Sequence, residues 1–295
     1  MGKMKTKIIL IDWNIFAHRA IFATAKNAQM SAEYCCVSMI LGCLTRIGVN
    51  PEDEIMLALD YGKSWRKSYD YDYKANRKAY RESFANINWK DLYERMNILR
   101  DKLEMSTNWQ ILKSEGLEAD DWCAVASRFF SNNIVVIVSY DKDLEQLLSY
   151  DNVRIFSPLT KTYKKVDNPY KCLSEKIKKE ASDNLNSPIL NEADFEKRNL
   201  IVNLLSLPEF VEQPAIEGFR NLELKGEDLD HFPFSNLRQR YENLNNPDPK
   251  KIVNYEKEML KKDKKVLKLK KLRKEKRLIK KGEKINGQES DNNCG

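Results

Sequence analysis

The chain has 295 residues, of which 42% are hydrophobic and 32% are charged, and this composition favours a globular fold with a sizeable core. Its 6 cysteines form no C-x-x-C pair and it has only 2 histidines, which argues against disulfides, a histidine-rich zinc site and a Ser-His-Asp triad. No apolar run approaches the length of a membrane span and the start lacks a signal-peptide pattern, so we expect a cytoplasmic protein without a membrane partner.

The first 160 residues alternate between predicted strands and helices. We predict strands at 7–11, 55–59, 109–112, 134–139 and 153–156, and helices at 14–26, 32–47, 89–103, 118–130 and 143–149. The strand at 134–139 is almost entirely β-branched, which is typical of a buried strand in a parallel sheet. The alternation therefore predicts an α/β fold in which helices flank a parallel sheet.

The rest of the chain is predicted to be helical, at 169–180, 192–205 and 211–224, with breaks at prolines. Pro247 and Pro249 mark a linker, which is followed by a Lys-rich helix at 250–281 and a disordered end at 285–295. We accordingly divide the chain into an α/β domain at 1–168, a smaller all-helical C-terminal region at 169–246 and a basic tail at 247–295.

The net charge of +7 is concentrated in that tail. Residues 257–284 hold 15 of the 51 basic residues and only 4 of the 44 acidic ones, whereas the remainder of the chain is slightly acidic. The tail could follow the phosphates of a nucleic acid, contact an acidic replication protein or simply be a solvated helix, and these alternatives stay open.

Acidic residues follow three of the predicted strands at the point where each strand ends. Asp12 follows the first strand, Asp60 follows the second, and Asp141 and Asp143 follow the strand at 134–139. Ligands bind at the carboxyl ends of parallel strands, so these side chains should share one pocket. A single aspartate after a strand is usually a turn or cap residue, but repetition at three strands favours a common site.

Further acidic residues open the predicted helix at 118–130. Glu118 precedes this helix, and Asp120 and Asp121 lie in its first turn, where they could also serve only the helix dipole. So many like charges are tolerable in one pocket only when cations neutralise them. Oxygen ligands favour Mg²⁺ or Mn²⁺, and two such ions can activate a water molecule and stabilise the leaving oxygen of a phosphodiester.

The segment at about 61–89 is aromatic and basic, with no clear period. Aromatic rings can stack on unpaired bases and cations can contact phosphates, although the alternative is an extended surface loop whose tyrosines cover the core. An arginine of the first predicted helix is a further candidate contact, or an ordinary surface residue. We predict nucleic-acid contacts from Arg19, Lys63, Arg66, Tyr73, Lys74, Arg77 and Lys78.

Five stretches match a known family in order and spacing. They are IDWN at 11–14, LD at 59–60, YKANR at 73–77, GLEADD at 116–121 and VSYDKDLEQL at 138–147. Over roughly residues 5–185 the chain resembles the 5′–3′ exonuclease and flap endonuclease family, and particularly its phage ribonuclease H type. The resemblance implies a PIN-like nuclease domain and, for a phage-encoded member, the cytoplasm of the infected cell.

The resemblance also implies roles for individual residues. It implies a first metal site formed by Asp12, Asp60, Glu118, Asp120 and Asp141. It implies a second metal site that includes Asp121, Asp143 and a later acidic pair. The segment at 61–89 would form an arch around a single-stranded 5′ end. Lys74 and Arg77 would lie near the scissile phosphate, where they could stabilise charge in the transition state. The residues expected to carry catalysis are Asp12, Asp60, Asp120, Asp141, Lys74 and Arg77.

Two departures from the family pattern follow residue 178. The family has Gly-Asp-x-x-Asp-Asn at the later acidic pair, and the sequence here is KEASDN at 179–184. Glu180 and Asp183 would then complete the second metal site, but an ordinary helix end explains the segment equally well. No Gly-x-Gly stretch follows Asn184, so the helix–turn–helix that grips the duplex in the family is shortened or replaced.

We therefore predict a metal-dependent 5′ nuclease that removes RNA primers and 5′ flaps in replication or repair, with two Mg²⁺ or Mn²⁺ ions. It would act as a monomer on DNA or RNA–DNA that carries a 5′ end or flap. A PIN-type ribonuclease for single-stranded RNA is one alternative, and the long aromatic segment argues against it. A catalytically inactive, structure-specific binder is another, favoured by the departures after residue 178 and opposed by the intact aspartates.

Overall fold

The computed structural model describes residues 6–25, 29–84, 87–178 and 189–269. By their contacts these fall into two compact units, 1–252 and 253–295. In the second unit, residues 255–269 form a helix. Glu180 and Asp183 lie outside the described residues, as do the disordered end expected at 285–295 and part of the predicted Lys-rich helix. The predicted division at 168 and 246 stays a prediction.

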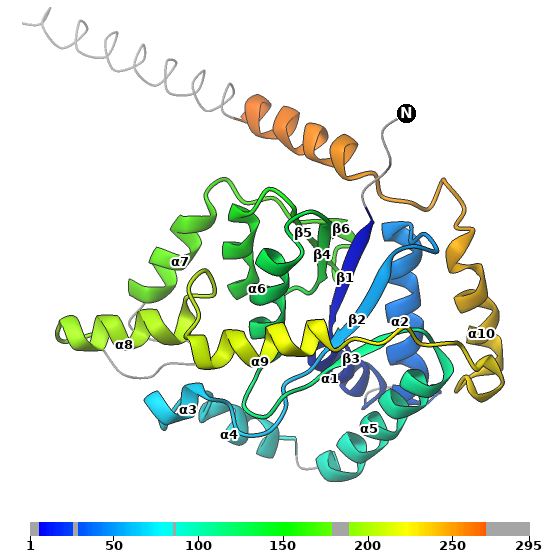
Figure 1. Ribbon diagram of the computed structural model, residues 1–295, viewed down its shortest axis with the longest axis horizontal. Helices are drawn as coiled ribbons and strands as arrows, with labels where there is room; N and C mark the ends of the chain where they lie inside the picture. The colour runs from blue at the N-terminus through cyan, green and yellow to red at the C-terminus, as the bar shows by residue number, and fades with distance from the viewer. Residues whose placement is uncertain (1–5, 26–28, 85–86, 179–188, 270–295) are drawn as a thin grey trace, which may run out of the picture. The chain divides into compact units, whose positions relative to one another are not determined.

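A six-stranded sheet with the order β3-β2-β1-β4-β5-β6 forms the centre of the first unit. Its strands are β1 Lys7–Asp12, β2 Glu54–Ala58, β3 Gln110–Leu112, β4 Ile134–Val138, β5 Val153–Ser157 and β6 Thr162–Tyr163. All pairs are parallel except β5 with β6. The predicted parallel sheet is confirmed. Because β1 lies between β2 and β4, the carboxyl ends of these three strands are neighbours (Figure 1).

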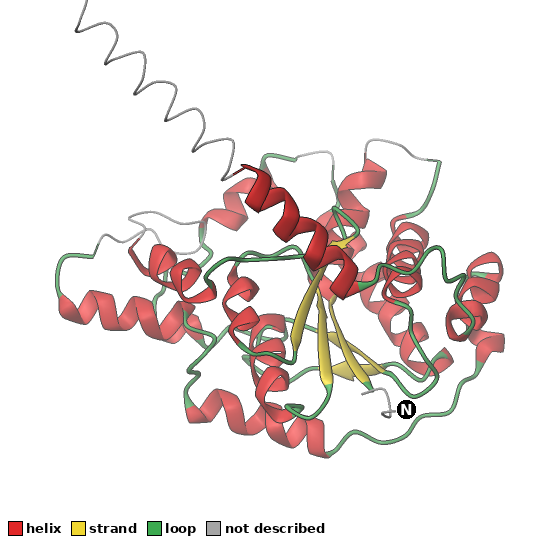
Figure 2. Ribbon diagram, turned by 90° about the horizontal axis from the view of Figure 1, so that it is seen from above, coloured by secondary structure: helices red, strands yellow, loops and turns green. Residues whose placement is uncertain are grey.

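Helices cover both sides of this sheet. They are α1 Trp13–Ala25, α2 Ala32–Ile47, α5 Trp89–Ser106 and α6 Ala119–Phe129. Helix α6 packs against β1, β2 and β4, while α1, α2 and α5 pack together on the other side (Figure 1), and Figure 2 shows helices on both sides of the strands. Ile8 and Leu10 join the core on the α6 side, and the alternate residues Ile9 and Ile11 are also fully buried. This two-sided burial explains why β1 reads as a continuous apolar run.

The helices after the sheet are α7 Pro169–Lys178, α8 Glu192–Val202, α9 Glu209–Arg220 and α10 Ser235–Glu242. The predicted helical C-terminal region is thus confirmed, although α10 was not predicted and Pro214 lies inside α9 rather than breaking it. Helix α9 packs closely on α6 at Gly218, where an added Cβ would lie 2.7 Å from the ring of Trp122. Only glycine permits this approach of the two helices.

The structure refines two local predictions. Residues 143–149, predicted as a helix of unspecified type, form a 3₁₀ helix, η1. Asp141 accepts a hydrogen bond at 2.8 Å from the backbone N–H of Asp143, and this tight turn leads directly into η1. The segment at 61–88, for which no period was found, contains two short helices, α3 Arg66–Tyr69 and α4 Asn76–Glu82. Both are too short for a helical period to be recognised.

Candidate metal centre and nucleic-acid interface

Four of the predicted carboxylates line one open pocket of about 1320 Å³. Asp12 is the last residue of β1, Asp60 follows β2, Asp141 follows β4, and Asp120 lies in the first turn of α6. The sheet order makes the ends of β2, β1 and β4 adjacent, and α6 begins beside them. The strand ends expected to share a pocket do so through Asp12, Asp60 and Asp141, whereas Asp143 is not among the residues that line it.

Short hydrogen bonds fix the carboxylates to the backbone around them. The hydroxyl of Ser139 donates to Asp12 at 3.2 Å and accepts from the backbone N–H of Asp141 at 3.0 Å, so it joins the ends of β1 and β4. The backbone N–H of Ala119 donates to Asp60 at 2.9 Å, which joins the end of β2 to the start of α6. The pocket is therefore held by the same turns that end its strands.

The electrostatics of the pocket favour the presence of a cation. Burial, together with the charges of Asp60 and Asp141, raises the pKa of Asp12 to about 7. Burial and the charge of Asp141 raise the pKa of Asp120 well above its ordinary value. These shifts mean that the ionised carboxylates repel one another when no positive charge lies among them. An all-oxygen donor set with an excess of negative charge fits a hard divalent cation.

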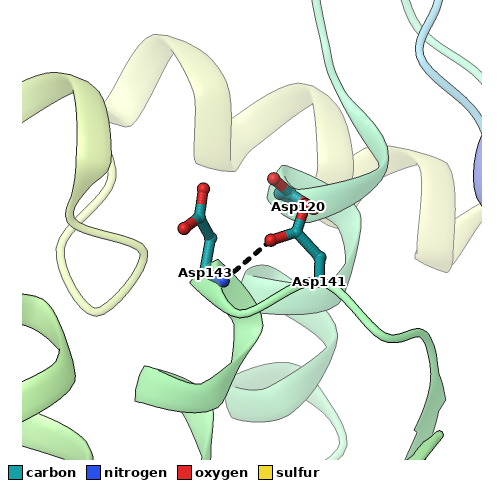
Figure 3. Close-up of side chains that lie close together, drawn as sticks. All are labelled: Asp120, Asp141 and Asp143. Carbon is teal, nitrogen blue, oxygen red and sulfur yellow. Dashed lines mark hydrogen bonds between the residues drawn. The ribbon is translucent and has the colours of Figure 1, made fainter. Parts of the chain in front are cut away.

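Asp143 extends this acidic group toward η1. Oxygen atoms of Asp120, Asp141 and Asp143 lie within 4.8 Å of one another, as Figure 3 illustrates. The side chain of Asp143 forms an ion pair with the ammonium group of Lys176 on α7. Burial lowers the pKa of Lys176, while the charges of Asp141 and Asp120 oppose that shift. Lys176 was missed in the sequence because it is one of several lysines on an amphipathic helix.

Glu118 and Asp121 lie apart from the pocket, in a buried cluster with Arg66. The guanidinium donates to Asp121 at 2.7 and 3.0 Å and to Glu118 at 2.9 Å, and the Trp65 ring N–H also donates to Asp121. Asp121 is fully buried and Arg66 is 2% exposed. Asp121 is thus neutralised from within the protein, and the buried Arg66 guanidinium has no free face for a phosphate.

Lys74 connects this buried cluster to the pocket. Its ammonium group donates to Glu118 at 2.6 Å, and Lys74 also lines the pocket. Although burial would raise it, the charges of Lys74 and Arg66 hold the pKa of Glu118 below its ordinary value. Tyr73 is buried and donates to Glu118 at 2.9 Å, so its ring supports the cluster rather than an open surface.

The remaining predicted contacts surround the same pocket or lie beyond it. Arg19 of α1 and Arg77 of α4 line the pocket beside the carboxylates. Lys63 is exposed just after the end of β2, and the side chain of Lys78 lies outside what the structure describes. Sequence reasoning missed the opposite wall, which is formed by His18, Phe22, Phe84, Tyr93 and Asn97. The Tyr93 hydroxyl lies 3.1 Å from His18.

Comparison with known proteins identifies the family. Residues 7–180 match the model of the family described as 5′–3′ exonuclease, N-terminal resolvase-like domain. The match covers more than half of the chain, so the chain belongs to this family. The resemblance inferred from the five sequence stretches is thereby confirmed.

Individual relatives share about 30% of their residues with this chain over part of its length. The chain is 31% identical to the ribonuclease H of Enterobacteria phage T4 over 141 residues, which are 45% of this chain and 46% of that protein. It is 29% identical to the 5′–3′ exonuclease of Mycoplasmopsis pulmonis over 150 residues, 50% of this chain and 47% of that one. The matched segments thus span about half the length of these relatives.

Among solved structures, the T5 5′-exonuclease with bound divalent zinc ions has a TM-score of 0.50 and 18% identity, covering 82% of this chain and 99% of that one. The T5 flap endonuclease in a pseudo-enzyme–product complex with DNA and metal ions also has a TM-score of 0.50, at 19% identity, covering 82% and 89%. At these identities the likeness establishes the α/β fold with its helical C-terminal region. None of the described helices is long and apolar enough to cross a membrane.

Proposed function

We propose that this chain is a metal-dependent 5′ nuclease that hydrolyses phosphodiester bonds in DNA or in RNA paired with DNA. Its expected substrates are 5′ ends and flaps, including RNA primers, during replication or repair. The observation that carries the proposal is the gathering of Asp12, Asp60, Asp120 and Asp141 in one pocket. Family membership supports the proposal, because the matched family is described as a domain of 5′–3′ exonucleases.

The cofactor in this proposal is Mg²⁺ or Mn²⁺. Such a cation, when bound, favours deprotonation of the attacking water and stabilises negative charge on the leaving oxygen. Asp12, Asp60, Asp120 and Asp141 would hold it, while Ser139 keeps two of these carboxylates in register through its hydroxyl. The second cation was predicted at Asp121, Asp143, Glu180 and Asp183; Asp121 is paired with the buried Arg66, and Asp143 remains a proposed ligand.

The basic residues of the pocket would act on the substrate. Arg77 and Arg19 lie on its rim and can contact phosphates on either side of the scissile bond. The ammonium group of Lys74 is held by Glu118, and the Lys74 backbone has a left-handed conformation with φ of 59°. This fixed position suits a lysine that stabilises developing charge without having to reorganise during the reaction.

The test is cleavage of a 5′-labelled flap DNA with Mg²⁺, with EDTA and with the Asp141→Ala variant. We expect the unaltered protein to cleave only with Mg²⁺, and the Asp141→Ala variant to bind the flap without cleaving it. Asp151→Ala, at an exposed turn outside the pocket, is the matched control and should cut normally. Tight flap binding without any cleavage by the unaltered protein would instead favour an inactive structure-specific binder.

A further inference from the structure

Lys176 differs from the other lysines of α7. Lys171 and Lys178 are exposed on this helix, and Lys171 pairs only with Glu175 of the next turn. The Lys176 side chain is 17% exposed and is paired with Asp143, which is 21% exposed. A lysine that buries its ammonium group beside an acidic pocket has a more specific environment than a solvated surface lysine.

The packing of α7 fixes Lys176 in this place. The adjacent residue Ile177 is buried in a small core cluster with Ile201 and Val202 of α8. The backbone carbonyl of Ile177 accepts a hydrogen bond from the buried Arg198 of α8. Helix α7 also packs along η1, which begins at Asp143. The position of the ammonium group is therefore set by the fold on both sides of the helix.

The partner of this ammonium group belongs to the acidic group of the pocket. Asp143 lies with Asp120 and Asp141 in the arrangement of Figure 3, where the three carboxylates are close enough to share a cation. Lys176 brings one positive charge to Asp143, whereas Asp12 and Asp60 line the pocket together with Asp120 and Asp141. Asp143 is thus the carboxylate of this group that Lys176 pairs with directly.

We infer that the ammonium group of Lys176 occupies the place where a second divalent cation would meet Asp143, so that the chain binds one divalent cation tightly and a second only after Lys176 has moved away. This inference rests on the proposed function, since it concerns the same pocket. A divalent cation and an ammonium group on one carboxylate repel each other strongly over a few ångströms. The second cation must therefore displace Lys176, and its affinity is reduced accordingly.

Mn²⁺ binding, measured by calorimetry and by the EPR signal of free Mn²⁺, tests this directly on the full chain. We expect one tight ion in the unaltered protein and a second that binds far more weakly. In Lys176→Met, which keeps most of the side-chain volume, the second ion should bind about tenfold to a hundredfold more tightly because the competing charge is gone. Lys176→Arg should retain the pattern of the unaltered protein.

Lys171→Met, on the exposed face of the same helix, is the matched control and should leave both affinities unchanged. A purely structural salt bridge at Lys176 would lower the melting temperature of Lys176→Met without altering its second Mn²⁺ affinity, and that result would overturn the inference. Absence of any Mn²⁺ binding in the unaltered protein would instead contradict the proposed function, so the two failures are distinguishable.

A second measurement needs no variant, in case Lys176→Met does not fold. The amine reactivity of Lys176 can be followed by labelling and mass spectrometry during a Mn²⁺ titration of the unaltered protein. We expect Lys176 to stay protected while the first ion binds and to become reactive only at the higher concentration that fills the second site. Protection that persists after two ions have bound would show that they do not compete with Lys176.

Discussion

The two aspartates of the Glu-Ala-Asp-Asp stretch are neighbours in sequence but lie in opposite surroundings. Asp120 faces the pocket, where burial and the neighbouring carboxylates raise its pKa, and Asp121 faces the interior, where Arg66 neutralises it. A helix turns successive residues by about 100°, so adjacent side chains can serve different sites. The first charge is left for an external cation, and the second is balanced by the chain itself.

The largest expected effect of this contrast concerns stability. Asp121→Ala leaves the buried Arg66 without its bidentate partner, so we expect a loss of about 3–5 kcal/mol in the free energy of unfolding. Asp120→Asn, measured by the same urea unfolding in EDTA, removes a repelled charge and should be neutral or stabilising. Equal losses in the two variants would mean that the two aspartates are not divided in this way.

Flap cleavage should depend more strongly on Asp120 than on Asp121, which is the reverse of the order expected for stability. Asp120→Asn removes a proposed metal ligand, and we expect flap cleavage to fall by more than roughly a hundredfold. Even the loss of a residue that only hydrogen-bonds to a metal ligand typically lowers metal affinity or activity by about 10–100-fold. The measurement is single-turnover cleavage with saturating protein. Binding of the uncut flap in Ca²⁺ serves as the control for folding and should remain.

The pH dependence of stability should distinguish the pocket from the buried cluster. In the folded protein the pKa of Asp12 is raised to about 7. At pH values between the ordinary pKa of an aspartate and 7, Asp12 therefore carries a proton in the folded protein but not in the unfolded chain. The contribution of Asp12 to the stability of the EDTA-treated protein should therefore be greater near pH 4 than near pH 7, and it is lost as the pH rises through the folded-state pKa. Mg²⁺ should reduce the loss, which thermal unfolding at several pH values can measure.

The smallest effect is expected from the positive charges of the tail. Removing residues 257–295 should weaken flap binding and flatten its dependence on salt, since fewer counterions are released on binding. Fluorescence anisotropy at several NaCl concentrations measures both quantities. An unchanged salt slope would direct attention to an acidic protein partner for the tail.

Much of the fold could be predicted because the information is local. The apolar runs of β1, β2 and β4 mark the sheet, and an aspartate at or just after each strand end marks the pocket. The ring of contacts around Arg66 could not be predicted, because Arg66 and Asp121 are 55 residues apart and no local pattern pairs them. Lys176 was missed for the same reason, since its partner depends on how α7 packs against η1.

Helix type is another point that local information leaves open. Residues 143–149 were predicted as a helix without a type, and the structure shows a 3₁₀ helix that begins directly after the turn made by Asp141. The pocket wall from α1 and α5 was also missed. Its histidine and aromatic residues resemble ordinary core positions, and only their common orientation toward the cavity distinguishes them.

Gly218 gives α9 an influence on the pocket although no side chain of that helix lines it. Because α9 approaches Trp122 of α6 so closely there, any side chain at this position would force the Trp122 ring or one of the two helices to shift. Helix α6 carries Asp120 in its first turn. A methyl group added at residue 218 would therefore affect the carboxylates indirectly, by displacing α6, and without contacting them. Variation of α9 in directed evolution should therefore alter cleavage even where no substituted residue meets the substrate.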